Sequence, residues 1–381
     1  MGSKVRVGLL YGGKSGEHEV SLQTALAVMG QFNYDKYEII PFYITKEGQW
    51  RSGATLHQPP ATIEQIKLAA NNDSSSIAML FQSDASCNNN ELQSSTERAY
   101  VSSVQTTDDR KVLDVIFPLL HGTYGEDGTV QGMLEMAGVP YVGAGVLASA
   151  VGMDKVMMKK VFAIEDLPQC VFRYFNRTQW DKDAPFFIME CEVSLGYPCF
   201  IKPANLGSSV GISKANNREE LIEAVNFAFR YDRKVIVEEF VDAREIEVSV
   251  LGNDEVQASV PGEIVPNNEF YDYKAKYIDG KSAMIIPAEL DEATTEQIRE
   301  MAVRAFQSID GSGLSRVDFF VGKEDNRIYI NEINTMPGFT PFSMYPLLWK
   351  ESGLSYGELL QKLIDLALER HAEKQRLVYT E

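Results

Sequence analysis

Residues 315–338 read SRVDFFVGKEDNRIYINEINTMPG, and this stretch decides the fold. Two runs of β-forming residues flank a short polar turn, which predicts an antiparallel hairpin. Because side chains repeat every two residues along a strand, Arg316 and Asp318 share one face of the first run. Glu332 and Asn334 share one face of the second run in the same way. If the strands pair so that these faces meet, Asp318, Glu332 and Asn334 come together at one place.

These last three side chains carry the hard oxygen atoms that suit Mg²⁺ held partly by substrate phosphates. The same pattern also fits the polar face of an exposed hairpin that binds nothing. The following loop, TMPGFT at 335–340, favours ligand binding, because the amide of Gly338 can approach a bound molecule closely. The hairpin therefore predicts a metal and phosphate site.

A second loop supplies groups that can bind phosphate. Lys202 ends the apolar run 198–202, and NLGSSVG at 205–211 is small enough for its backbone amides to fold over phosphate oxygens. A β run resumes at Ile212, so we predict a strand-loop-strand flap, although such a loop is often a plain turn. Lys155, on an expected helix, offers a second cation, with a solvated lysine as the alternative.

Residues 8–15, GLLYGGKS, match the P-loop expression letter for letter. We interpret the match as accidental, because the run 5–11 reads as one strand and puts Gly8 inside it, where the motif requires a loop. Residues 16–19, GEHE, also bring acids where phosphate would lie. The better interpretation is a glycine turn that aims Glu17 into a cleft, where it can pair with a substrate ammonium group.

Two further loops carry polar and aromatic side chains. His121 opens HGTYGEDG at 121–128, after an expected strand, and a lone histidine there is more often structural than catalytic. Residues 267–277 hold four aromatic side chains among acids and lysines, which predicts a lid that excludes water.

The remaining runs predict an α/β chain of three domains. Two glycine-rich loops follow expected N-terminal strands, and open parallel sheets bind ligands at that strand edge. The expected domains are 1–142 with a polar insertion at about 71–109, 143–241, and 242–381 with the lid loop at 267–280.

Local signals place three further elements. The spacing of apolar residues predicts a helix over 20–29 with Ser21 as its cap. It also predicts a helix over 153–162 and a strand over 168–173.

The composition excludes several classes of protein. The 381 residues are 44% hydrophobic and 24% charged, unlike disordered, collagen-like or coiled-coil chains. The net charge of −18 argues against nucleic acid and anionic membranes as partners. No apolar run approaches the ~20 residues that cross a bilayer, and the N-terminal run is too short for a secretory signal. Four cysteines without a CxxC pair predict reduced thiols. We therefore expect a cytoplasmic protein.

Taken together, five blocks resemble the ATP-grasp ligases and, within them, the D-alanine–D-alanine ligase family. They are GGKSGEHEVS at 12–21, HGTYGEDGTVQGMLE at 121–135, IKPANLGSSVGIS at 201–213, YDYKAKY at 271–277, and SRVDFFV with INEINTMPG at 315–321 and 330–338. The resemblance implies a three-domain ATP-grasp architecture, in which an open parallel sheet is followed by two α+β domains that clamp ATP.

The resemblance also implies the reaction. ATP phosphorylates the carboxylate of one D-alanine, and the amine of a second D-alanine attacks the acyl phosphate, giving D-alanyl-D-alanine for peptidoglycan. Two Mg²⁺ ions, with Mn²⁺ as an alternative, would be held by Asp318, Glu332 and Asn334. The implied partners are D-alanine, ATP and a second copy of the chain.

Further roles follow residue by residue from the resemblance. The residues that match the phosphate contacts are Lys155, Lys202, Ser208, Ser209 and Lys276. Those that match the adenine and ribose contacts are Glu238, Glu239, Val241 and Glu245. Glu239 stands where many relatives have lysine, which leaves a backbone contact with adenine open at that position.

The amino-acid contacts match in the same way at Glu17, His121, Arg316, Gly338, Ser343 and Met344. Glu17 would accept the first ammonium group, with His121 near the first carboxylate. Arg316 and the amide of Gly338 would form the oxyanion site, where fixed donors help most as charge develops. Ser343 and Met344 would hold the second carboxylate.

A trio of residues in the resemblance joins the three domains. It corresponds to Glu17, Ser208 and Tyr277, which would close the lid over a filled site. Tyr277 is associated with D-alanine as second substrate, whereas relatives that use D-lactate commonly carry phenylalanine.

A P-loop NTPase and a non-catalytic amino-acid-binding protein remain the alternatives to the ligase. An assay of ADP formation with and without D-alanine separates the three functions.

Overall fold

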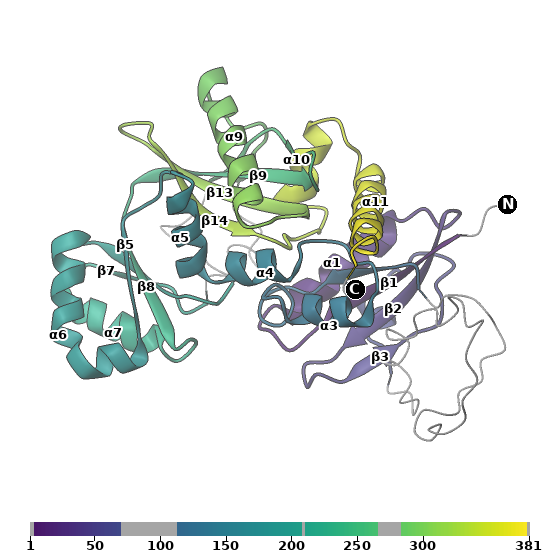
Figure 1. Ribbon diagram of the computed structural model, residues 1–381, viewed down its shortest axis with the longest axis horizontal. Helices are drawn as coiled ribbons and strands as arrows, with labels where there is room; N and C mark the ends of the chain where they lie inside the picture. Colours follow the sequence, from purple (N-terminus) through teal and green to yellow (C-terminus); the bar gives the residue numbers. More distant parts are fainter. Residues whose placement is uncertain (1–3, 70–112, 208–209, 266–282, 379–381) are drawn as a thin grey trace.

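The structure is a computed structural model that describes residues 4–69, 113–207, 210–265 and 283–378. The predictions that lie outside the described residues concern the insertion at 71–109, the lid at 267–280, Ser208, Ser209, Lys276 and Tyr277. Figure 1 shows three β-sheets, with the first in sequence at the right, the second at the left and the third between them.

The N-terminal sheet has the strand order β3 (Trp50–Ser52), β2 (Tyr37–Ile44), β1 (Val5–Gly12), β4 (Val115–Leu119). β1 pairs in parallel with β2 and β4, and only the edge strand β3 runs antiparallel. Gly8 lies inside β1, opposite Ile40, so the P-loop interpretation is excluded. The loops after β1 and β4 lie at the same edge of the sheet, as predicted.

Helices α1 (His18–Gln31), α2 (Ile63–Ile66) and α3 (Thr129–Ala137) accompany this sheet. The prediction that Ser21 caps α1 is wrong, because the helix begins three residues earlier. The Ser21 hydroxyl instead accepts a hydrogen bond from the Gly12 amide and donates to the Leu119 carbonyl. It therefore ties the helix to the ends of two neighbouring strands.

The central sheet is antiparallel, with the order β5 (Phe172–Asn176), β8 (Lys234–Glu239), β6 (Cys199–Pro203), β7 (Ser213–Ala215). Helices α6 (Arg177–Ser194) and α7 (Arg218–Ala228) pack on its outer face. β6 and β7 pair antiparallel and enclose the glycine-serine loop, which confirms the strand-loop-strand prediction.

Helix α4 (Val146–Met153) leads into α5 (Lys155–Ile164), which lies between the central and third sheets. Val156 packs with Ile236 on the inner face of the central sheet, while Met158 and Phe162 join the core of the third sheet. The helix predicted over 153–162 is α5, which begins two residues later than predicted and follows the separate helix α4. Asp154 separates them, because its carboxylate accepts the amides of Val156 and Met157 and caps α5.

The third sheet has the order β12 (Ala283–Ile285), β11 (Gly262–Val265), β9 (Ala243–Gly252), β13 (Gly313–Gly322), β14 (Ile328–Asn334), with β10 (Gln257–Ala258) beside β9. Helix α9 (Glu292–Ser308) packs on β9, β13 and β14, and α10 (Met344–Glu351) packs on β9. The predicted hairpin is β13 with β14, in the register Arg316 opposite Asn334 and Asp318 opposite Glu332.

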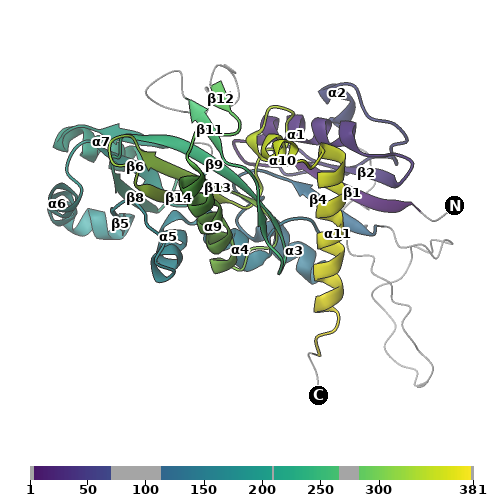
Figure 2. The ribbon, with the colours of Figure 1, turned by 90° about the horizontal axis from the view of Figure 1, so that it is seen from above.

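The last helix, α11 (Tyr356–Lys374), returns to the first sheet (Figure 2). Its apolar stripe, represented by Leu359 and Leu363, shares one core with Leu9 and Phe117 of the N-terminal sheet. A salt bridge joins Lys374 of this helix to Glu135 of α3 at 2.5 Å.

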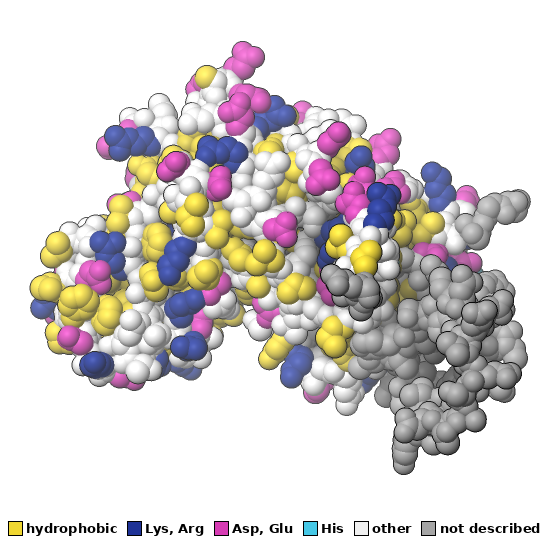
Figure 3. Space-filling view, in the orientation of Figure 1, with side chains coloured by type: hydrophobic (Ala, Val, Ile, Leu, Met, Phe, Trp, Pro, Cys, Tyr) yellow, Lys and Arg dark blue, Asp and Glu magenta, His cyan; other side chains and the backbone are white. Residues whose placement is uncertain are grey.

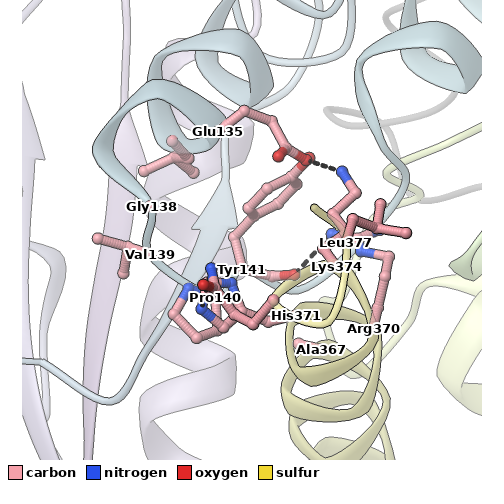
Figure 4. A pocket seen from close by; sticks show the side chains of 12 residues that line it. Glu135, Gly138, Val139, Pro140, Tyr141, Ala367, Arg370, His371, Lys374 and Leu377 are labelled. Carbon is pink, nitrogen blue, oxygen red and sulfur yellow. Dashed lines mark hydrogen bonds and ion pairs between the residues drawn. The ribbon is translucent and has the colours of Figure 1, made fainter. Parts of the chain in front are cut away.

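Arg370 is a second cation of this junction, beside Lys374 (Figure 4). It lies over the Tyr141 ring and donates to the backbone oxygens of Tyr141 and Gly143 and to the Ser312 hydroxyl. A cavity of about 330 Å³ opens beside it, between α3 and α11. Arg370 therefore links three distant segments of the chain through neutral acceptors.

The sequence analysis misplaced the start of one strand and missed one helix. The strand predicted over 168–173 begins only at Phe172, because the Pro168 carbonyl accepts the Ile330 amide of β14 instead of joining β5. Helix α6 was missed, since Asp183 and Pro185 interrupt its pattern and Asp183 takes non-helical backbone angles.

None of the helices in the described ranges is both long and apolar enough to cross a membrane. On the face shown in Figure 3, the described acidic and basic side chains are interspersed and form no continuous basic surface. This distribution accords with the acidic net charge of −18.

Candidate active site

The β13–β14 hairpin places four polar side chains in one cluster. Arg316 donates from Nε and Nη2 to the two oxygens of Asp318, both at 2.7 Å. Asn334 of β14 donates to Asp318 Oδ2 at 3.0 Å, and Glu247 of β9 lies 3.0 Å from Arg316 Nε. Of the three oxygen-bearing residues predicted to converge, Asp318 and Asn334 are in contact and Glu332 lies opposite Asp318 in the register. Glu247 is a partner of Arg316 that sequence analysis missed.

Helix α5 brings a cation to the same hairpin. Lys155 Nζ lies 3.2 Å from Glu332 Oε2 of β14 and donates to the Leu206 carbonyl of the flap at 3.1 Å. Lys155 therefore joins the hairpin to the flap, which supports a site between the central and third sheets.

The second expected cation, Lys202, forms an ion pair with Glu238 of the neighbouring strand β8. Lys159 of α5 lies 2.8 Å from the other carboxylate oxygen of Glu238. Lys159 and Glu238 are almost completely buried. Sequence analysis missed Lys159, although its four-residue spacing from Lys155 places both lysines on one face of α5.

Burial and charge oppose each other at Glu238. Burial disfavours its carboxylate, but the ammonium groups of Lys159 and Lys202 outweigh this and hold the pKa of Glu238 well below its usual range. Burial likewise works against charged Lys202, and the charge of Glu238 nevertheless raises the pKa of Lys202. Glu238 and Lys202 are therefore both ionised and form an ion pair, with Lys159 at the other carboxylate oxygen.

The hairpin acids fit a divalent metal that shares its coordination with phosphate. Two carboxylates and a carboxamide, from Asp318, Glu332 and Asn334, offer only hard oxygens and too few of them to enclose an ion. In the described part of the chain, no group of three His, Cys, Asp or Glu side chains is arranged to hold a metal by itself. Such an ion would need oxygens from a ligand, as Mg²⁺ in nucleotide sites does.

Glu17 lies at the meeting point of two loops. It is buried, and a Cβ added at Gly122 would come within 3.0 Å of its Oε2. A Cβ at Gly207, in the flap, would come within 3.4 Å of its Oε1. Glycine at these positions lets both loops close on the Glu17 carboxylate, which therefore sits beside the flap as expected.

Glu126 is a partly buried acid near Glu17 that sequence analysis did not single out. It accepts the Gly122 amide at 2.6 Å. Burial, and then the charge of Glu17, raise the pKa of Glu126 to about 8. Near neutral pH Glu126 therefore holds a proton while it braces the loop that begins at His121.

His121 is buried and bonded on both ring nitrogens. Nε2 lies 3.1 Å from the Thr24 hydroxyl, and Nδ1 lies 3.1 Å from the Met336 carbonyl of the loop after β14. Burial lowers its pKa to about 4, so the ring is neutral at pH 7. His121 joins the N-terminal sheet to the loop that carries Gly338.

The loop after β14 holds three of the expected residues. Ser343 Oγ accepts the Thr340 amide at 3.0 Å, and a Cβ at Gly338 would come within 2.9 Å of that oxygen. Met344 begins α10 and is buried against Gly262 of β11. Gly338 and Ser343 are therefore neighbours, as a shared binding site requires.

The residues expected to contact adenine and ribose lie at the end of β8, in the connection to β9 and in β9 itself. Glu239 ends β8, and its side chain accepts the Val171 amide at 2.7 Å. Val241 lies in the connection to β9, and Glu245 lies within β9, opposite Phe320. They therefore follow Glu238 along the chain from the central sheet into the third.

Comparisons with known proteins agree with this geometry. Two family models match: D-ala D-ala ligase N-terminus over residues 6–144 and D-ala D-ala ligase C-terminus over residues 161–365. The D-alanine–D-alanine ligases of Bacillus cytotoxicus and Listeria monocytogenes are 53% and 50% identical to the chain. In each pair 99% of this chain and 99% of the relative are covered.

Solved structures show the same likeness. The D-alanine-D-alanine ligase from Coxiella burnetii is 34% identical, with a TM-score of 0.76 over 98% of this chain and 97% of that one. The VanG D-Ala:D-Ser ligase from Enterococcus faecalis is 35% identical, with a TM-score of 0.75 over 96% of this chain and all of that one. The predicted α/β ATP-grasp fold is confirmed. The chain belongs to the D-alanine–D-alanine ligase family, and it is an ATP-dependent ligase that uses a divalent metal.

Proposed function

We propose that this chain joins two D-alanine molecules to D-alanyl-D-alanine at the expense of ATP, for peptidoglycan precursor synthesis. The observation that carries the proposal is the pairing of cations with acids between two sheets. Lys155 of α5 pairs with Glu332 of the hairpin, and Lys202 pairs with Glu238 of the central sheet. A nucleotide phosphate is an anion, so it can take the place of Glu332 beside Lys155 and of Glu238 beside Lys202. A divalent metal ion can then take the place of Lys155 beside Glu332.

In the first step, a carboxylate oxygen of the first D-alanine attacks the γ-phosphorus, and the bond to the ADP oxygen breaks. Lys155 and Lys202 hold the phosphates, with Ser208, Ser209 and Lys276 beside them. Asp318, Glu332 and Asn334 would hold two Mg²⁺ ions. When bound there, the ions would neutralise charge on the transferring phosphoryl group.

In the second step, the amine of the second D-alanine attacks the acyl carbon, and inorganic phosphate leaves. Arg316 and the Gly338 amide stabilise the oxyanion of the tetrahedral intermediate. The guanidinium of Arg316 needs little reorganisation, because Asp318 and Glu247 already orient it.

The remaining residues bind the substrates. Glu17 accepts the first ammonium group beside the flap, and neutral His121 positions the loop at the first carboxylate. Ser343 and Met344 hold the second carboxylate. The trio of Glu17, Ser208 and Tyr277 closes the site. Adenine and ribose contact Glu238, Glu239, Val241 and Glu245.

The proposal extends to the organisation of the protein. The domains are 1–142, 143–241 and 242–381, each built around one of the three sheets. We place the enzyme in the cytoplasm, where ATP and free D-alanine are available. We also propose that it forms a homodimer. Light scattering of the purified chain measures the dimer directly.

Analysis of the products tests the function. The chain is incubated with Mg·ATP and D-alanine alone, and then with D-alanine mixed with D-serine or D-lactate. We expect ADP and D-alanyl-D-alanine in equal amounts, and the dipeptide as the main product of both mixtures. ADP release without D-alanine would indicate an NTPase. A mixed product with D-serine or D-lactate would correct the second substrate.

A further inference from the structure

Lys159 is a buried cation that neither the phosphate contacts nor the metal ligands use. Only 1% of its side chain is exposed, against 13% for Lys202 and 12% for Lys155. Its Nζ faces Glu238 Oε1 at 2.8 Å and lies 5.8 Å from the centre of the Phe172 ring. Removing an ammonium group from water is costly, so a lysine at this depth calls for a reason.

The shared carboxylate indicates that reason. Glu238 holds one ammonium group on each of its oxygens, so two cations share one acid. The three groups lie on the inner face of the central sheet, between β6, β8 and α5. The arriving phosphates take Lys202, which is the more exposed of the two lysines. Glu238 then keeps Lys159 as its remaining cation.

We propose that Lys159 is a positioning residue for nucleotide selection: it keeps the Glu238 carboxylate ionised and in place after Lys202 has turned to the phosphates. This inference rests on the proposed function, in which Glu238 contacts adenine. An ionised carboxylate only accepts hydrogen bonds, so it favours the C6 amino group of adenine over the C6 oxygen of hypoxanthine. Lys159 would thereby select ATP over inosine triphosphate without touching either base.

The test compares ATP with inosine triphosphate as the nucleotide for ligation. In Lys159→Met, Glu238 loses its remaining cation and takes up a proton, so its carboxyl can also donate. We expect the ratio of kcat/KM for ATP to that for inosine triphosphate to fall at least tenfold. This loss should come mainly from a higher KM for ATP, with the KM for D-alanine changed less than twofold. Lys159→Arg should retain most of the selectivity, because it preserves the charge.

Lys160→Met is the matched control. Lys160 is the next residue of α5, but it is exposed and lies over the Tyr174 ring outside this cluster. In Lys160→Met, the ratio of kcat/KM for ATP to that for inosine triphosphate should equal the ratio of the unmodified chain. A fall in Lys160→Met as large as in Lys159→Met would overturn the inference.

A double-variant cycle decides the question even if Lys159→Met alone fails to fold. Removing both groups of the Lys159–Glu238 pair, in Lys159→Met with Glu238→Gln, avoids leaving either of these two groups buried as a charge without its partner. The double variant should show the same nucleotide ratio as Glu238→Gln alone, within twofold, because Lys159 acts only through Glu238. A further tenfold loss in the double variant would contradict that.

The outcomes separate the inference from the function beneath it. If the unmodified chain forms no dipeptide with ATP, the proposed function fails. If it forms the dipeptide and Lys159→Met keeps the nucleotide ratio, only the role of Lys159 is refuted.

Discussion

Two partly buried arginines show how differently this fold uses the same side chain. Arg370 of α11 donates to two backbone carbonyls and a hydroxyl, which are neutral acceptors set by the fold. Arg316 of β13 donates to Asp318 and pairs with Glu247, which are acidic side chains of the third sheet. Backbone acceptors cannot move away without unfolding, whereas a carboxylate can exchange its partner for a ligand. The partners of a partly buried cation, and not its degree of burial, therefore separate a structural role from a functional one.

The largest expected effect is on catalysis at Arg316. Arg316→Ala should lower kcat by about 10²–10³-fold, because oxyanion donors act in the transition state. Affinity for ATP should change less than threefold, since the lysines that hold its phosphates remain. Steady-state kinetics and calorimetric titration with ATP measure the two quantities. Near-normal turnover would remove Arg316 from the mechanism.

At Arg370 the effect should fall on stability instead. Arg370→Met leaves the Tyr141 and Gly143 carbonyls and the Ser312 hydroxyl without their donor, so the free energy of unfolding should drop by about 2–4 kcal/mol. Urea unfolding measures the change. The KM for ATP measured on the folded fraction should stay the same, and a large change in it would blur the contrast between the two arginines.

Glu126 should make the stability of the fold depend on pH. The pKa of Glu126 is raised from 4.5 to about 8, so between those values the folded state keeps a proton that the unfolded state loses. Stability from this group is therefore lost as pH rises through that window. Glu126→Gln should flatten the dependence and be more stable than the unmodified chain by at least about 2 kcal/mol at pH 8.5. Thermal unfolding across pH 5–8.5 measures it, and parallel curves would contradict the assignment.

The smallest effect is expected at the partly exposed neighbour of Arg370. Lys374→Met removes one ion pair with Glu135, which still accepts from the Tyr141 hydroxyl. Exposed pairs contribute little, so the free energy of unfolding should fall by less than about 1 kcal/mol. Urea unfolding beside Arg370→Met provides the measurement. A loss as large as that of Arg370→Met would show that the whole junction acts as one unit.

Local sequence patterns predicted much of the candidate active site. Alternation placed Arg316 and Asp318 on one strand face and Glu332 and Asn334 on the next, and the observed register confirms it. The continuous strand at 5–11 also excluded the P-loop. Such inferences succeed because period-two geometry needs no knowledge of distant residues.

Contacts between distant segments were not predictable in this way. Glu126 looked like one of several polar loop residues, and its pKa depends on burial and on Glu17 from another loop. Sequence analysis did not single out Lys159, and only the packing of α5 against the central sheet buries it on Glu238.

The amino-acid order alone determined the hairpin, the flap, the acidic charge and the family, since each follows from neighbours along the chain or from motifs in a fixed order. Only the tertiary structure decided which lysine is buried, which acid keeps its proton and which arginine braces the C-terminal helix. The physical reason is that desolvation and charge pairing depend on distances in space, and those distances exist only once the three sheets have packed together.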